Sequence, residues 1–271
     1  MLRIAAAFIA LFATTSSAMA ESGPTGSICI GFGPQTPRDI DRKSGANAVR
    51  FATAPASTEM DLCNIHLHES AEHKAAAYSI YAGPGDGHGF GSGYKCAMGE
   101  SLTEAERKPT AEPICAGEHG DLKPGDTIEV HWVYSSCEVT PGPTLGACLS
   151  ESCNNPQLRV EAQVFTLVND PNAANFASFG YDGGLKAGRH QPASLPVGTG
   201  TPVTFMGSTT GPSYDAAKCS PFQVTWSVRP QCAKLDINSL GRFCKGNVFK
   251  EDHAHGVRTL VVEPSLLSWI E

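Results

Sequence analysis

Three stretches in which apolar and polar residues alternate constrain the fold most: 61–68, 127–134 and 158–168. Because successive side chains of a strand point to opposite faces of a sheet, this period of two predicts β-strands. The stretch 127–134 is the strongest of them, since it is rich in β-branched and aromatic residues. Further short strands are expected over 203–207, 222–228 and 257–262. The sequence therefore predicts a mainly β protein.

Helices are expected to be few and short, because 28 glycines and 19 prolines are spread along the 271 residues. The best helix candidate is 101–108, where Ser101 and Glu104 resemble a capping box. Residues 71–81 fit either a short helix or a second strand. Six glycines make 83–93 a loop.

The first 20 residues have the pattern of a secretory signal peptide. A basic start at Arg3 is followed by a mostly apolar stretch and by the small-residue sequence Ala18-Met19-Ala20. We expect cleavage to leave residues 21–271 as one domain, exported to the periplasm or secreted. No later stretch has the roughly 20 apolar residues of a membrane span. The formal net charge of −7 and the absence of basic clusters disfavour nucleic acid and anionic membranes as partners.

Ten cysteines lie after the predicted leader. An even number in an oxidising compartment indicates up to five disulfide bonds. No Cys-x-x-Cys motif is present, which argues against thiolate zinc and thioredoxin-like chemistry. Spacing does not determine the pairing, although Cys148 with Cys153 and Cys232 with Cys244 would close plausible local loops.

The first alternating stretch carries a pair of histidines on one face. Asn64, His66 and His68 would point one way, and Ile65 and Leu67 the other. Two imidazoles held on a strand make half of a metal site, whereas the alternative is a surface strand with incidental histidines.

A third imidazole lies on the second alternating stretch, where Glu129, His131 and Val133 share a face. Three neutral imidazoles with one open position form a catalytic zinc site, in which the metal lowers the pKa of its bound water to about 7. Glu129 and Asn64 each lie two residues before a histidine and could accept its second ring proton. Glu72 and the hydroxyls of Thr209 and Thr210 could orient a hydroxide.

These residues stand in an order that resembles the alpha and delta classes of carbonic anhydrase, and the delta class more closely. The matching segments are Gln35-Thr36-Pro37-Arg38-Asp39-Ile40, His66-Leu67-His68, Glu72-His73, Glu129-Val130-His131-Trp132, Gly207-Ser208-Thr209-Thr210 and Val224-Thr225-Trp226. They are colinear over about 190 residues. The Ser-to-Thr change in the first segment, the short Thr-Thr loop and a cysteine-bearing insertion depart from the alpha pattern.

The resemblance implies a zinc lyase that reversibly hydrates CO2 to bicarbonate and a proton. His66, His68 and His131 would bind Zn²⁺. Glu129 would orient His131, and Asn64 would orient His66.

The resemblance also implies that Glu72 accepts a hydrogen bond from Thr209, which accepts one from a zinc-bound hydroxide; Thr210 could hold that role instead. Val133, Val224 and Trp226 would line an apolar CO2 pocket. The implied fold is a single domain around a large twisted mixed or antiparallel β-sheet with short peripheral helices.

The remaining histidines are less informative. His88 and His119 are candidates for a proton shuttle only by residue type and loop position. His73 fits a structural role better than a ligand role. The second His-x-His, His253-Ala254-His255, follows charged residues without a strand pattern and is interpreted as surface.

Two rival functions remain. A cupin-type metal-binding barrel enzyme would also use His66, His68 and His131, and would make Glu72 a fourth metal ligand, but it leaves the Gln-Thr-Pro and Thr-Thr segments unexplained. A non-catalytic exported zinc-binding protein is the other alternative, although such proteins usually lose a ligand.

Overall fold

The computed structural model describes residues 29, 31–215 and 217–271, so the predicted leader, residues 1–20, lies outside the described residues. The strands are β1 (Asp61–Glu69), β2 (Ile80–Tyr81), β3 (Tyr94–Lys95), β4 (Ile114–Gly117), β5 (Gly120–Leu122), β6 (Thr127–Ser135), β7 (Leu158–Val168), β8 (Leu185–Lys186), β9 (Arg189–His190), β10 (Val203–Ser208), β11 (Gln223–Val228) and β12 (Ala233–Asp236). The helices are α1 (Ile237–Cys244) and the 3-10 helices Ser57–Glu59, Ala97–Ser101, Leu145–Cys148, Phe176–Ser178 and Pro264–Leu266.

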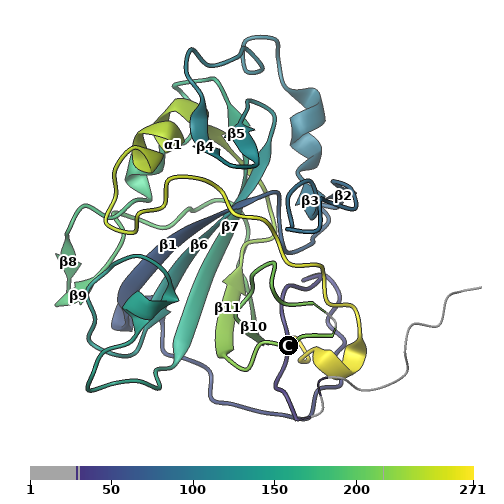
Figure 1. The fold of residues 1–271 in the computed structure, drawn as a ribbon, viewed down its shortest axis with the longest axis vertical. Helices are drawn as coiled ribbons and strands as arrows, with labels where there is room; N and C mark the ends of the chain where they lie inside the picture. The colour runs from purple at the N-terminus through teal and green to yellow at the C-terminus, as the bar shows by residue number, and fades with distance from the viewer. Residues whose placement is uncertain (1–28, 30, 216) are drawn as a thin grey trace, which may run out of the picture.

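One mixed sheet of six strands forms the centre of a mostly β single domain, as predicted (Figure 1). Its order is β1-β6-β7-β11-β10, and β12 also pairs with β7. The pairs β1–β6, β6–β7 and β10–β11 are antiparallel, whereas β11 and β12 run parallel to β7. The two end strands of this path are not paired with each other in the described chain, so the sheet is open.

The alternation predicted for the long strands is confirmed by two separate apolar clusters, one on each face of the sheet. Ile65 and Leu67 belong to the cluster that α1 covers, together with Trp132 of β6. Val133 and Trp226 belong to the cluster on the other face. The even-numbered polar residues of β1 therefore share the second face, where the candidate site lies.

Two of the predicted elements are wrong. No helix covers 101–108: the 3-10 helix Ala97–Ser101 ends where the predicted helix would begin. A turn follows, in which Thr103 and Glu106 bond to each other. Lys108 precedes a proline, which disfavours helical backbone there. The segment 257–262 is not a strand: Val257 and Arg258 donate their N–H groups to the Gly89 carbonyl and the Glu72 carboxylate, respectively.

The only α-helix of the described chain, α1, was not predicted. Asp236 caps it by accepting from Asn238 N and Ser239 N. Gly241 lies inside the helix and packs closely on Ile114, whose Cδ1 would stand 2.8 Å from a Cβ at that position. None of the helices in the described ranges is both long and apolar enough to cross a bilayer.

The five predicted disulfide bonds are confirmed, and all ten cysteines take part. The pairs are Cys29–Cys219, Cys63–Cys148, Cys96–Cys232, Cys115–Cys244 and Cys137–Cys153. The two local pairs considered from spacing are wrong, because four of the bonds join residues at least 85 positions apart. Only Cys63, in β1, lies in a strand of the central sheet; the other bonds join loops and peripheral elements to one another.

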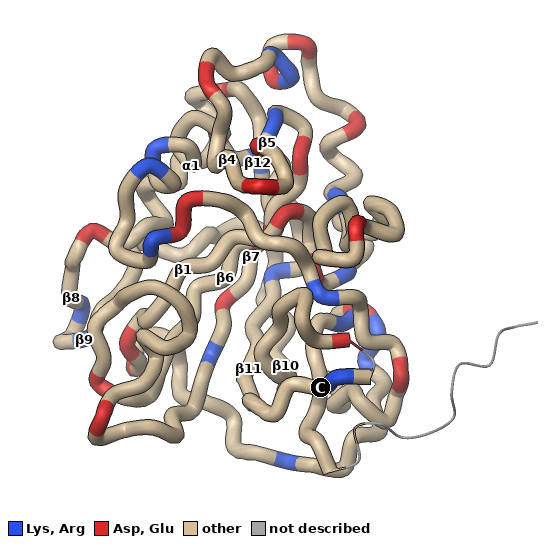
Figure 2. Tube along the Cα trace, viewed as in Figure 1, with Lys and Arg blue, Asp and Glu red and all other residues tan. Residues whose placement is uncertain are grey.

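Charged residues are dispersed through the described chain. Figure 2 shows Lys and Arg interspersed with Asp and Glu rather than gathered on one element.

Candidate metal centre

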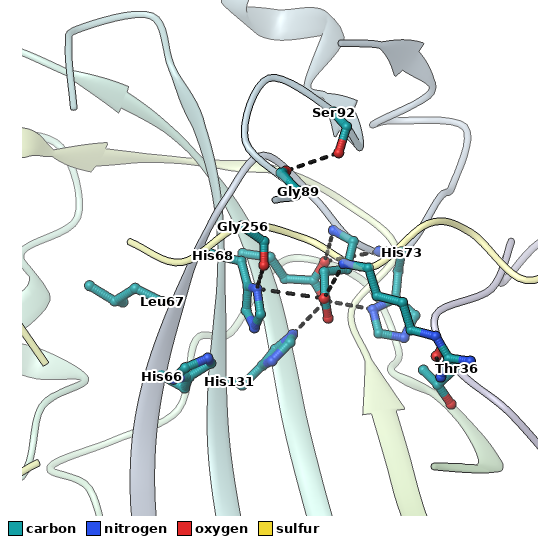
Figure 3. A network of polar contacts seen from close by, with 12 residues as sticks. Thr36, His66, Leu67, His68, His73, Gly89, Ser92, His131 and Gly256 are labelled. Atoms are coloured by element: carbon teal, nitrogen blue, oxygen red, sulfur yellow. Dashed lines mark hydrogen bonds and ion pairs between the residues drawn. The ribbon is translucent and has the colours of Figure 1, made fainter. Parts of the chain in front are cut away.

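The pairing of β1 with β6 brings three imidazoles together on one face of the sheet. His66 stands directly opposite His131 in the register, and His68 stands opposite Glu129. The ring centroids are 4.6 Å apart for His66–His68, 4.7 Å for His68–His131 and 6.5 Å for His66–His131. Figure 3 shows the three rings side by side along the two strands.

His68 has the geometry of a neutral ligand. Its Nδ1 lies 3.2 Å from the carbonyl oxygen of Gly256, and a carbonyl only accepts, so this nitrogen carries the ring proton. Burial lowers the pKa of His68 well below its ordinary value, and the charges of His66 and His131 lower it further. The remaining nitrogen, Nε2, is buried and has no hydrogen-bond partner among the described residues. A buried lone pair of this kind fits a metal ion.

His131 contacts Glu129, the residue expected to orient it. Its Nε2 lies 3.0 Å from Glu129 Oε1, which leaves Nδ1 available to a ligand. The same carboxylate contacts His73 Nδ1 at 2.6 Å and accepts the backbone N–H groups of Glu72 and His73. Burial alone would raise the pKa of Glu129, but the facing His73 and His131 rings hold it well below the usual range. Glu129 is therefore an ionised acceptor that fixes two imidazoles.

The predicted contact between Asn64 and His66 is not formed in the described chain. The register of β1 with β6 shifts between Leu62 and Asn64. The Nδ2 of Asn64 donates to the carbonyl of Gly142 at 3.0 Å. His66 Nδ1 instead lies 3.4 Å from Glu251 Oε1. A carboxylate from the C-terminal segment thus holds the position expected for the asparagine amide.

Glu251 is the site residue that the sequence analysis missed. Its Oε1 accepts the N–H of Leu67 at 2.6 Å, and its Oε2 lies 3.3 Å from His255 Nε2. Burial would raise the pKa of Glu251, but hydrogen bonds from His255 and His66 outweigh it and lower the pKa to about 2. The Glu-x-x-x-His spacing of 251–255 was the only local signal.

His255 is not the plain surface residue that was expected. Its backbone pairs with β1, donating to the carbonyl of Leu67 and accepting from the N–H of Glu69. Its ring stacks on that of His66 with centroids 4.4 Å apart. We call His66, Glu251 and His255 the rim cluster, and His68, Glu72, Glu129 and His131 the interior cluster.

Glu72 and Thr209 lie in the site but are not bonded to each other in the described chain. Glu72 Oε1 accepts the N–H of Arg258 at 2.9 Å, while its buried Oε2 has no partner there. Burial raises the pKa of Glu72. Thr209 Oγ1 lies 2.6 Å from Ser220 Oγ, so the threonine hydroxyl that was expected to bond to Glu72 is bonded to Ser220 instead.

The potential metal-binding atoms form separate groups, and His66 is not in the same group as His68 and His131. One group joins His68, Glu72 and His131, whose donor atoms lie within 4.8 Å of one another. A second joins His66, Glu251 and His255 by the same measure. His66 thus lies next to the interior cluster while its ring faces the rim cluster.

A cavity of about 1160 Å³ opens onto this face. Its lining includes all three histidines, the predicted pocket residues Val133, Val224 and Trp226, and three further predicted site residues, Asn64, Thr209 and Thr210. Glu72 and Glu129 are fully buried behind them. His88 and His119 lie at the same cavity, and His119 Nδ1 contacts Asp86 Oδ2 at 3.0 Å. The cavity is therefore lined by imidazole and apolar side chains, and the carboxylates of Glu72 and Glu129 are buried beneath that lining.

Comparison with known proteins yields a family match. The family model described as delta carbonic anhydrase matches residues 57–239, more than half of the chain. No curated protein matches the sequence.

Solved structures with similarity include a hyperthermostable carbonic anhydrase identified from an active hydrothermal vent chimney, at 16% identity over 88% of this chain and 86% of that one, with a TM-score of 0.30. Others are the alpha-carbonic anhydrase of Thermovibrio ammonificans in complex with sulfanilamide (14% identity, 84% and 83% covered, TM-score 0.30) and that of Photobacterium profundum (15%, 86% and 88%, 0.27). At these TM-scores the assignment rests on the family match, which contains β1, β6 and the three imidazoles. The chain belongs to the delta carbonic anhydrase family.

Proposed function

We propose that this carbonic anhydrase hydrates CO2 reversibly at a zinc ion held by His66, His68 and His131. The observation that carries the proposal is the buried, unpartnered Nε2 of His68 beside the rings of the other two histidines. Three neutral imidazoles suit zinc, and a fourth position remains for substrate. Bound zinc would supply Lewis acidity and lower the pKa of a coordinated water to about 7.

Each proposed ligand has one acceptor on its other nitrogen. The Gly256 carbonyl serves His68, Glu129 serves His131 and Glu251 serves His66. Such acceptors fix the tautomer and the ring orientation, so each imidazole presents a lone pair toward the metal. They come from the C-terminal segment and β6, which ties the ligand geometry to the tertiary fold.

The apolar side of the cavity is proposed to receive CO2. Val133, Val224 and Trp226 are each no more than 4% exposed, and they line the cavity with the histidines. Because CO2 is uncharged, a wall of this kind can hold it by displacing loosely bound water.

Thr209 is proposed to orient the attacking oxygen. Its hydroxyl would donate to the free Oε2 of Glu72 and accept a hydrogen bond from the nucleophile. This requires Thr209 to exchange its contact with Ser220 for one with Glu72. Thr210 lines the same cavity and is the alternative residue for this role.

Export is proposed from two features. The first 20 residues have a leader pattern, and the five disulfide bonds require an oxidising compartment to persist. We propose the periplasm or the extracellular medium as the location of the catalytic domain, residues 21–271.

Stopped-flow CO2 hydration by zinc-loaded protein tests the function. We expect hydration well above background for the natural chain and background rates for His131→Ala, because the variant lacks an imidazole from β6. Equal rates for the two proteins would reject the assignment.

One observation favours a second arrangement, in which Glu72 binds the metal with His68 and His131. It shares Glu72, His68 and His131 with the ligand set of the cupin alternative but leaves out His66. The open sheet and the delta carbonic anhydrase match do not support a cupin fold.

A further inference from the structure

The rim cluster is a set of metal-binding atoms that the proposed zinc site does not use. Donor atoms of His66, Glu251 and His255 lie within 4.8 Å of one another. The side chains of His66 and His255 are 31% and 34% exposed, whereas that of Glu251 is 6% exposed. All three line the cavity, so an ion can reach them from solvent.

The backbone holds these donors in place. Glu251 Oε1 accepts the N–H of Leu67, and the N–H of His255 donates to the carbonyl of the same residue. The N–H of Glu69 donates in turn to the carbonyl of His255. The C-terminal segment is therefore fixed along β1, and the donor set is preorganised.

Two imidazoles and one carboxylate form a ligand set that zinc uses in proteins, and imidazole donors favour Zn²⁺ and Cu²⁺ over Mg²⁺ and Ca²⁺. We propose that the rim cluster is a second binding site for a divalent cation of the zinc and copper class. The inference rests on the proposed function, because the second site shares His66 with the proposed catalytic zinc.

Sharing His66 makes the two sites compete. A neutral imidazole has one lone pair. When His66 binds the catalytic zinc through Nε2, its Nδ1 carries the proton and donates to Glu251, 3.4 Å away. A cation in the rim cluster takes the lone pair at Nδ1 and moves the proton to Nε2. Occupation of the rim cluster therefore removes one ligand from the catalytic set, so excess zinc inhibits.

Titration of the protein with zinc chloride tests this inference, with bound metal counted by mass spectrometry and CO2 hydration followed in parallel. We expect the first equivalent to activate and a weaker second equivalent to inhibit. His255→Ala should weaken the second equivalent by at least about tenfold and abolish the inhibition. Its activity with one equivalent is the reference against which its inhibition is measured. His255→Gln provides a second variant if the alanine variant does not fold.

His119→Ala is the matched control, because His119 lines the same cavity outside the rim cluster. This variant should still bind two equivalents. A natural chain that binds one equivalent without inhibition would overturn the inference, as would undiminished second binding by both His255 variants. If the one-zinc protein fails to hydrate CO2 while the His255 variants still lose the second equivalent, the proposed function fails and the rim site stands.

Discussion

The interior cluster and the rim cluster use the same residue types in different environments. In the interior, Glu129 is fully buried and contacts two imidazoles and two backbone N–H groups. At the rim, Glu251 contacts two imidazoles that are about one-third exposed. Water can replace a lost partner at the rim but not in the interior. The same chemical change should therefore cost more at Glu129 than at Glu251.

The largest effect is expected from Glu129→Gln. The amide keeps one oxygen, so the two donors that face its NH2 group are left buried without an acceptor. We expect zinc affinity to fall by about 10–100-fold and the free energy of unfolding to fall by about 2–3 kcal/mol. Competition with a chelator and urea denaturation measure the two quantities. A variant with native zinc affinity would contradict the role of Glu129 in orienting His131.

Glu251→Gln should have a smaller effect on zinc affinity, about tenfold or less. His66 is partly exposed and can donate its ring proton to water when the carboxylate is absent. The same chelator competition, run beside Glu129→Gln, gives the comparison directly. A larger loss for Glu251→Gln than for Glu129→Gln would reverse the ranking of the two clusters.

Glu251 should also make stability depend on pH. Its pKa is about 2 in the folded protein against an ordinary value of 4.5. A carboxyl whose pKa is lowered by folding stabilises the native state fully above 4.5 and loses that contribution as pH falls toward 2. The contribution is at most about 3 kcal/mol.

Urea denaturation of chelator-treated protein between pH 6 and pH 3 measures this contribution. The stability difference between the natural chain and Glu251→Gln should shrink as pH falls through this range. A difference that is constant with pH would show that the Glu251 carboxylate gains no stabilisation from its imidazole partners.

The smallest effect is expected from Asn64→Ala. Its amide donates to Gly142 rather than to a ring nitrogen of His66, so the loss is one hydrogen bond between β1 and a loop. We expect about 1 kcal/mol less stability and kcat/KM within about twofold of the natural chain. A large fall in activity with unchanged stability would restore the role first predicted for Asn64.

Local pattern was enough to predict the parts of the fold that follow a period of two. β1, β6 and β7 were found because apolar and polar residue types alternate along them, and Glu129 was assigned to His131 because both lie on one strand face. α1 was missed because it has only eight residues and contains Gly241, a residue that disfavours helix. Its Asp236 cap was the available signal.

Contacts between distant segments could not be read from local pattern. Glu251 reaches Leu67 across 184 positions, and nothing around residue 251 indicates that partner. The disulfide pairing failed for the same reason, since Cys96 bonds to Cys232 and Cys115 to Cys244. These partners are set by how the C-terminal segment crosses the sheet (Figure 1).

The central claim is that three imidazoles hold the metal while Glu72 stays outside the ligand set. Zinc X-ray absorption on protein loaded with one equivalent tests it most directly. We predict three imidazole nitrogens at about 2.0–2.1 Å and the same spectrum for Glu72→Gln. A spectrum with two imidazoles and a carboxylate oxygen, altered in Glu72→Gln, would contradict the claim and assign the metal to His68, Glu72 and His131.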